Sequence, residues 1–292
     1  MWRTRRACSI MASMNQSSRL SVSSWSLHRA LGAPPFWGVA DQQPQWTPPV
    51  NAVSLLELPA RVAAFGINTM EICHFHLPRR DESYLRELRS ALEEARVELW
   101  SLLIDDGDLT HETDGARDRE WIAGWIDVAS TLGARNARVI AGKSEPTPEN
   151  LGRSRAAFQT LCARAKAGQV RVMTENWYGL LSIPEQVLWL LDEMEGDVGL
   201  CADFGNWSGP DKYEKLAQIL PRADSLHAKC RFADAPASRE TMDRDDFTRC
   251  LNLVRDADFS GPFTLIYDSP DADEWRALAL YLPEVEPYLV TS

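Results

Sequence analysis

Val170-Arg171-Val172-Met173-Thr174-Glu175-Asn176-Trp177 is an apolar-rich run that ends abruptly in a carboxylate, an amide and an aromatic ring. Three later apolar runs end in a similar way, at Asp203, His227 and Asp268. Short apolar runs bounded by polar residues are typical of buried β-strands. When parallel strands close into a barrel, their carboxyl ends meet at one mouth. We therefore expect these four polar side chains to lie together.

Strand-like runs alternate with helical patterns along the chain. Strands are expected at residues 20–27, 69–73, 97–104, 137–141, 170–175, 198–203, 225–227 and 263–268. Helices are expected at residues 55–65, 82–95, 117–132, 148–167, from 184 onward, 211–220, 243–257 and 273–288. Eight strand–helix units across about 270 residues predict an α/β fold, a single-domain (β/α)8 TIM barrel. A doubly wound open sheet is the alternative, but it would normally show a glycine-rich phosphate turn, which the sequence lacks.

The composition argues against several classes of protein. The chain has 292 residues, a net charge of −11 and a pI near 5.0, a balance that disfavours nucleic-acid binding and anionic membrane surfaces. No apolar run approaches the ~20 residues that a membrane helix needs. The six cysteines are scattered without a CxxC motif, which is typical of reduced thiols, so we expect a cytoplasmic protein.

The first residues differ from the rest of the chain. Three arginines are followed by polar residues, without the apolar core of a secretory signal. We expect a disordered N-terminal extension at residues 1–18 and the barrel domain at residues 19–292. A transit peptide, or a translation start at Met11 or Met14, is the alternative account of this segment.

Acidic side chains are concentrated at the expected strand ends. Glu175, Asp203 and Asp268 would repel one another at one mouth unless a cation neutralised them, and a divalent ion is the usual answer. Three carboxylates and the His227 imidazole suit one Mn²⁺, Mg²⁺, Co²⁺ or Zn²⁺ ion, with positions left for two substrate oxygens. Taken singly, each acid is more often a solvated or helix-capping residue, and His227 has the alternative of a hydrogen-bonded core histidine. Their occurrence at four consecutive strand ends favours the metal.

Three motifs carry a resemblance to a known family. They are Thr174-Glu175-Asn176, residues 202–206 (Ala-Asp-Phe-Gly-Asn) and residues 226–229 (Leu-His-Ala-Lys). They resemble the Glu-Asn, Asp-x-Gly-Asn and His-x-Lys strand ends of the sugar phosphate isomerase/epimerase family, the xylose-isomerase-like barrels. The resemblance covers nearly the whole chain, from residue 23 to about residue 289.

The resemblance implies a ligand set and a chemistry. Glu175, Asp203 and His227 would bind the metal, and the fourth ligand, usually a glutamate on strand eight, would be Asp268. A metal on a carbonyl oxygen and an adjacent hydroxyl stabilises the enediolate formed when a proton leaves the neighbouring carbon. A carboxylate on each face of that carbon removes the proton and returns it. Glu175 and Asp268 are therefore the expected catalytic pair.

Other side chains are candidates for contact with the substrate. Lys229 would polarise a hydroxyl, and Glu71 and His76 would hold substrate hydroxyls. His74 and His76 alternate on the expected second strand, so we expect them to point the same way. The proline- and tryptophan-rich loop at residues 28–51 is expected to be a lid or binding loop, with internal packing or a homo-oligomer contact as alternatives. Apolar walls against a sugar face would come from Trp25, Trp37 and Trp177.

These features favour an enzyme, a metal-dependent isomerase or 3-epimerase of a ketose or related sugar. A sugar lyase or dehydratase of the inosose or 3-keto-sugar type is the first alternative, because the same enediolate can eliminate a β-substituent. An apurinic endonuclease is disfavoured by only five histidines and an acidic charge. A non-catalytic sugar-binding barrel is disfavoured by the complete ligand set. Because no Arg/Lys pair or glycine-rich turn follows strands seven and eight, a neutral sugar is expected.

Overall fold

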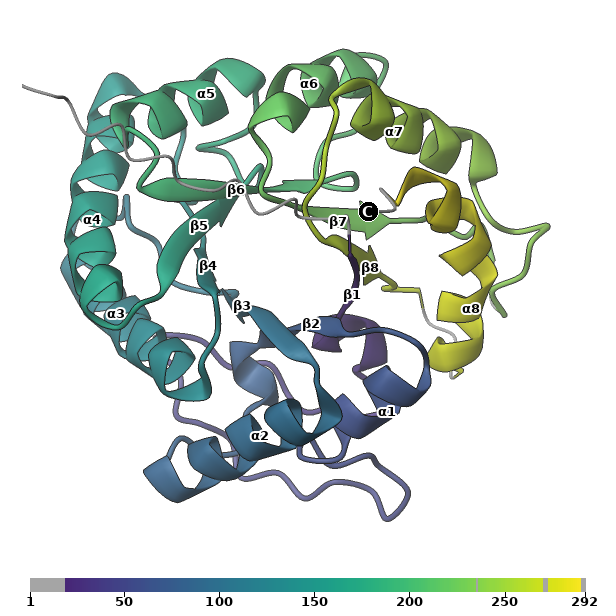
Figure 1. The fold of residues 1–292 in the computed structure, drawn as a ribbon. Helices are drawn as coiled ribbons and strands as arrows, with labels where there is room; N and C mark the ends of the chain where they lie inside the picture. The colour runs from purple at the N-terminus through teal and green to yellow at the C-terminus, as the bar shows by residue number, and fades with distance from the viewer. Residues whose placement is uncertain (1–18, 235, 270–272, 290–292) are drawn as a thin grey trace, which may run out of the picture.

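The computed structural model describes residues 19–234, 236–269 and 273–289. The disorder expected for residues 1–18 falls outside the described residues. Eight parallel strands form a closed barrel in the order β1 to β8, with β8 paired back to β1, and the helices surround it (Figure 1). The expected (β/α)8 barrel is confirmed.

The elements follow one another in strict strand–helix alternation after β2. The strands are β1 (Leu20–Ser23), β2 (Thr69–Cys73), β3 (Glu98–Ile104), β4 (Asn136–Val139), β5 (Arg171–Glu175), β6 (Val198–Asp203), β7 (Ser225–Lys229) and β8 (Phe263–Ile266). The helices are α1 (Leu58–Ala64), α2 (Glu82–Ala95), α3 (Gly115–Leu132), α4 (Pro148–Ala167), α5 (Pro184–Glu193), α6 (Lys212–Ile219), α7 (Arg244–Asp256) and α8 (Glu274–Val285).

The strands are buried on both faces, as parallel strands between a barrel core and a ring of helices must be. Every residue of β2 and of β6 is buried. Local signals set the helix starts: the Thr147 hydroxyl accepts the N–H of Asn150 at 3.2 Å, and Pro148 occupies the first turn of α4, where no N–H is needed. Burial therefore determines where the strands lie, and capping helps to determine where helix α4 begins.

Three strands end earlier than expected: β1, β8 and β4, which ends at Val139 instead of residue 141. β1 ends at Ser23, whose hydroxyl accepts the N–H of Trp25 at 3.2 Å and starts a 3₁₀ turn. β8 ends at Ile266, so Asp268 lies in the loop beyond the strand. The apolar pattern continues past the ends of β1 and β8, which is why it predicted longer strands.

The second strand ends at Cys73, and His74 and His76 form a 3₁₀ turn instead of continuing it. The expectation that the two rings point the same way is wrong. The His74 ring contacts the Trp37 carbonyl at 3.0 Å and accepts the N–H of Asp105 at 3.1 Å. The His76 ring instead lies between the Ser24 hydroxyl and His28.

Strand register sets which side chains become neighbours at the mouth. Glu175 of β5 is paired with Cys201 of β6, and Asp203 of β6 is paired with His227 of β7. Three consecutive strands therefore present four chemically active side chains side by side.

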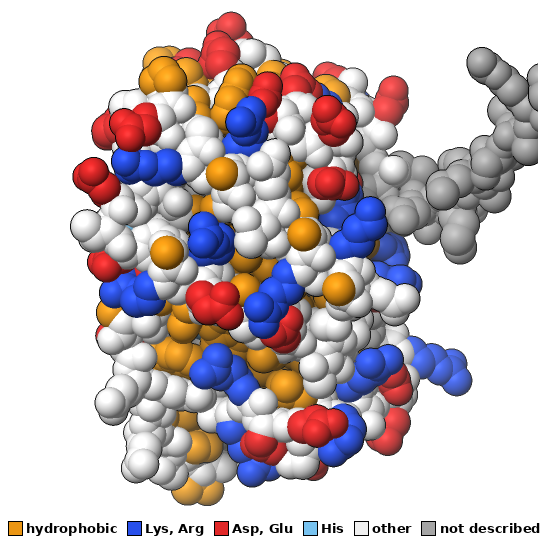
Figure 2. Space-filling model, turned by 90° about the vertical axis from the view of Figure 1, so that its left-hand side faces the viewer, with side chains coloured by type: hydrophobic (Ala, Val, Ile, Leu, Met, Phe, Trp, Pro, Cys, Tyr) orange, Lys and Arg blue, Asp and Glu red, His pale blue; other side chains and the backbone are white. Residues whose placement is uncertain are grey.

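Figure 2 shows the side of the barrel that carries α3 and α4, where basic and acidic side chains are interspersed. None of the helices described in the structure combines the length and apolar character needed to cross a membrane.

Candidate metal centre

A cavity of about 340 Å³ opens at the carboxyl ends of the strands. A larger groove of about 1110 Å³ lies at the opposite end, beside Glu98 and Arg171, the first residues of β3 and β5. Barrel enzymes carry their chemistry at the carboxyl ends, so the smaller cavity is the candidate site. Its lining consists of Ser23, Trp25, Phe36, Cys73, Phe75, Leu103, Asp105, Arg138, Glu175, Trp177, Tyr178, Asp203, Asn206, His227, Lys229, Ile266 and Asp268.

His227 is the centre of the acidic cluster. Its Nε2 atom lies 2.9 Å from Glu71 Oε2, across the barrel on β2. Its Nδ1 atom lies 3.5 Å from Asp203 Oδ2 and 3.6 Å from Glu175 Oε1. A histidine that ligates a metal commonly has its other ring nitrogen held by a carboxylate. The arrangement around His227 has this form.

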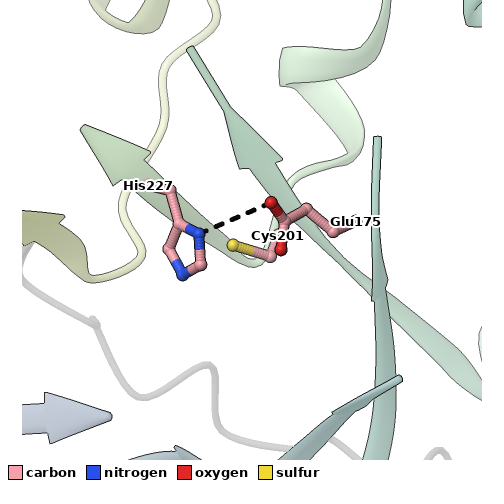
Figure 3. A group of neighbouring side chains, drawn as sticks. All are labelled: Glu175, Cys201 and His227. Atoms are coloured by element: carbon pink, nitrogen blue, oxygen red, sulfur yellow. Dashed lines mark ion pairs between the residues drawn. The ribbon is translucent and has the colours of Figure 1, made fainter. Parts of the chain in front are cut away.

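Glu175, Cys201 and His227 come from three adjacent strands and point toward one another (Figure 3). One potential ligand atom from each lies within 4.8 Å of the others, and all three residues are buried. Cys201 was not among the predicted site residues. It stands two residues before Asp203, so its side chain lies on the same face of β6, a period-2 signal that the sequence does contain.

Asparagines and backbone amides fix the acids in place. Asn176 Oδ1 accepts the Asp203 N–H at 2.7 Å, and Asn176 Nδ2 donates to the Asp203 carbonyl at 3.1 Å. The Asp203 carboxylate accepts the N–H groups of Gly205 and Asn206, and the Asn206 side chain donates to Glu175. The two motif asparagines thus act as braces between strands.

Arg138 of β4 also belongs to this cluster, although it was not among the predicted site residues. Its side chain is buried, donates from Nη2 to Asp105 and places Nε 3.1 Å from Glu175 Oε2. The guanidinium carbon lies 5.3 Å from the centre of the Trp177 ring. A lone arginine within an apolar strand was the sequence signal for it.

The charges of the cluster are strongly coupled. Burial alone would lower the pKa of His227, but the neighbouring carboxylates of Glu175 and Glu71 raise it well above its ordinary value. Burial raises the pKa of Cys201 to about 11, which keeps that thiol neutral. The charges that raise the pKa of His227 are therefore those of the Glu175 and Glu71 carboxylates. Burial opposes the charge of Glu175, yet Arg138 and His227 hold its pKa below the ordinary value.

Lys229 and Asp268 form an ion pair on the cavity wall. The Asp268 side chain is 32% exposed, against 4% for Glu175, because it stands beyond the end of β8. The structure therefore brings Glu175, Asp203 and His227 together and places the fourth expected ligand with a cation.

Trp25 and Trp177 line the cavity as expected. Trp37, His76 and Glu71 are not among the residues that line it, and their expected contact with substrate stays a prediction. Trp37 is 4% exposed and packs against the His74 ring, and Glu71 lies beneath His227. Both Trp37 and His76 border a separate groove of about 580 Å³ under the proline-rich loop.

Solved structures share this architecture. A D-allulose 3-epimerase from Methylomonas sp. matches with a TM-score of 0.67 at 15% identity, over 94% of this chain and 99% of that chain. A probable 3-DHS dehydratase, AsbF, from Bacillus anthracis matches with a TM-score of 0.61 at 15% identity, over 89% and 97%. A xylose isomerase-like TIM barrel protein from Mycobacterium smegmatis in complex with magnesium matches with a TM-score of 0.61 at 16% identity, over 83% and 94%. At these identities the likeness shows the fold.

Sequence comparison gives the family. No curated protein matches this chain. The family model described as xylose isomerase-like TIM barrel matches residues 59–285, which include β2 to β8. The chain belongs to the xylose isomerase-like TIM barrel family.

Proposed function

We propose that this protein is a divalent-metal-dependent isomerase or epimerase of a ketose or related sugar, acting through an enediolate. The observation that carries the proposal is His227, held by Glu71 on one ring nitrogen while the other faces the carboxylates of Glu175 and Asp203. This group forms the floor of a cavity of about 340 Å³, within the range of about 300–1,000 Å³ that small-molecule sites occupy.

The donor set fits a metal ion. Glu175, Asp203 and His227 would hold it, and the nearby Cys201 thiol is a donor that Zn²⁺ and Co²⁺ accept more readily than Mg²⁺ or Mn²⁺. When bound, such an ion would act as a Lewis acid toward a substrate carbonyl. The local charge also favours a cation, because five carboxylates face only two fixed positive charges. The carboxylates are Glu71, Asp105, Glu175, Asp203 and Asp268, and the cations are Arg138 and Lys229.

Two carboxylates would carry the proton. Asp268 is open to the cavity, and Lys229 beside it would stabilise charge on a substrate hydroxyl. Glu175 stands at the buried floor and would serve the other face of the reacting carbon. Geometry of this kind lets one group remove a proton and the other return it.

The cavity suits a neutral substrate with an apolar face. Its net negative charge would oppose a phosphate or carboxylate on the substrate. The outer walls are aromatic, from Trp25, Phe36 and Phe75 on one part of the rim and from Trp177 and Tyr178 on another. Aromatic walls with a polar floor are typical of small-ligand sites.

A sugar dehydratase or lyase is the second candidate. The observation that favours it is the Lys229 ammonium beside Asp268, because an ammonium group can protonate a hydroxyl as it leaves. The two candidates differ only in whether the proton returns to carbon or a hydroxyl departs.

Metal analysis tests the site. Purified protein loaded with Mn²⁺, Co²⁺ or Zn²⁺ and then desalted should retain about one ion per chain. Glu175→Ala and His227→Ala should lose it, and Glu82→Ala, an exposed acid on α2, should keep it. Equal metal content in all four proteins would remove the proposed centre.

Incubation with a panel of neutral ketoses in D₂O tests the reaction. Incorporation of deuterium at carbon without an unsaturated product supports an isomerase or epimerase. An unsaturated product with ultraviolet absorbance supports the dehydratase. If no sugar exchanges its proton, neither activity stands.

A further inference from the structure

The guanidinium of Arg138 makes fewer hydrogen bonds than a buried cation requires. Arginine has five N–H donors in a fixed fork. Nη2 donates to Asp105, and Nε lies 3.1 Å from Glu175 Oε2, close enough for an ion pair but not aligned for a hydrogen bond. Nη1 is buried and has no acceptor among the described residues. Two donor atoms, Nε and Nη1, of a residue that lines the cavity are therefore left without a hydrogen-bond acceptor.

The surroundings bury this arginine in the site and compensate its charge. Arg138 is only 3% exposed, and it lines the same cavity as Glu175. Asp105 and Glu175 compensate its charge, and the Trp177 ring lies against the guanidinium. A buried polar group without a partner costs stability, so it calls for an explanation in terms of structure or function. A barrel interior filled only for stability would carry an apolar residue at this position of β4.

We propose that Arg138 is a catalytic residue that donates a hydrogen bond from Nη1 to the substrate oxygen on which negative charge develops. This role rests on the proposed function. In the step concerned, the C–H bond next to the carbonyl breaks and its proton passes to the Asp268 carboxylate. The electron pair of that bond forms the C=C bond, and the former carbonyl oxygen takes the negative charge. When Asp268 returns the proton to carbon, the C=C electron pair forms the new C–H bond, the oxyanion re-forms the C=O bond and Asp268 is again a carboxylate.

Charge balance distinguishes this role from binding of an acidic substrate. Protonation of Asp268 removes one negative charge from the cavity as the oxyanion adds one, so the net charge stays constant through the step. A substrate carboxylate would instead add a charge to a site where Asp105 and Glu175 already neutralise Arg138. A preorganised donor aimed at a developing oxyanion is worth about 100- to 1,000-fold in rate.

The test uses the ketose that shows the fastest exchange in D₂O, with kcat, KM and metal content measured for each protein. Arg138→Lys keeps the charge but loses the fork, and Arg138→Gln keeps a neutral donor. The double variant Arg138→Gln/Asp105→Asn removes the arginine with its carboxylate, so neither is left alone in the interior. Arg171→Lys, on the exposed start of β5, is the control.

We expect kcat to fall about 100- to 1,000-fold in all three Arg138 variants, with KM within threefold and metal content unchanged. The affinity for a four-carbon hydroxamate, which carries the planar oxygen pair of an enediolate, should fall more than the affinity for the ketose. A correctly folded variant with kcat within threefold of the unaltered protein would overturn the role, and so would an equal loss of hydroxamate and ketose affinity. Absence of exchange by the unaltered protein would overturn the proposed function and this role with it.

Discussion

Replacement of Glu71 by glutamine tests whether His227 is a metal ligand whose ring is oriented by the Glu71 carboxylate. Glu71 is 1% exposed, and its Oε2 atom lies 2.9 Å from His227 Nε2. Glutamine has nearly the same shape, and its carbonyl oxygen can still accept the Nε2 hydrogen. The substitution therefore removes the negative charge next to the His227 ring while preserving the hydrogen bond to it. Glu71→Ala removes both.

The expected loss of metal affinity follows from what such carboxylate partners contribute in other metal sites. Loss of a carboxylate behind a ligating histidine typically weakens metal binding by about 10- to 100-fold. Each tenfold step corresponds to about 1.4 kcal/mol. Because glutamine retains the hydrogen bond, we expect about tenfold weaker binding for Glu71→Gln, and about 100-fold for Glu71→Ala.

Calorimetric titration of the metal-free proteins would measure the dissociation constant of each protein for Mn²⁺ and for Zn²⁺. Glu82→Gln on α2 removes the same charge from an exposed position and should bind like the unaltered protein. Thermal unfolding of the metal-free variants would show that each is folded. Binding within twofold of the unaltered protein in both Glu71 variants would refute the assignment of His227 as a ligand.

Three further predictions concern stability. Asn176→Ala should lower the free energy of unfolding by about 3 kcal/mol in urea titration, because the buried N–H and carbonyl of Asp203 lose their partner, and a loss below about 1 kcal/mol would contradict the bracing role. Gly261→Ala would place a Cβ atom 2.1 Å from a backbone carbonyl oxygen and should lower the melting temperature. Gly124→Ala, which has open space around it on α3, should raise the melting temperature slightly. A lower melting temperature for Gly124→Ala than for Gly261→Ala would be inconsistent with the packing. Burial opposes the charge of Asp105, but Arg138 holds the pKa of that carboxyl below the ordinary 3.8. The charged Asp105 therefore contributes stability above about pH 4, and this contribution is lost as the pH falls further. The difference in melting temperature between the unaltered protein and Asp105→Asn should therefore shrink on acidification from pH 6 to pH 3, and a constant difference would show that the pair does not titrate in this way.

The alternation of strand and helix signals was sufficient to predict the barrel, and the rule that chemistry lies at strand ends led to Glu175, Asp203 and His227. Strand ends were less predictable. At Ser23 a single side-chain hydrogen bond starts a turn, while the apolar pattern continues unchanged into it. The position of Asp268 was misjudged for the same reason, because apolar residues extend past the last paired residue of β8.

Cys201 and Arg138 were not predicted because most candidates were taken from the last residues of the strands. Cys201 lies deeper in the barrel, two residues before the end of β6. Arg138 precedes the last residue of β4, and its role depends on Asp105, just after β3, and on Glu175, at the end of β5. Contacts of this kind follow from closure of the barrel, which no local pattern records. The partnership of Glu71 with His227 is the clearest example.

The bond between Glu71 and His227 joins residues that are 156 positions apart in the chain. Contacts of such high sequence separation are slow to form, because a long loop must be ordered before they can repay its entropy. A nascent or refolding chain therefore acquires an oriented His227 only when β2 and β7 are both in place. A bound ion would then stabilise the closed barrel selectively, since ligands that bind only the native state add to its stability by mass action. Uptake of metal would accordingly report the last stage of folding, in which β2 and β7 come together.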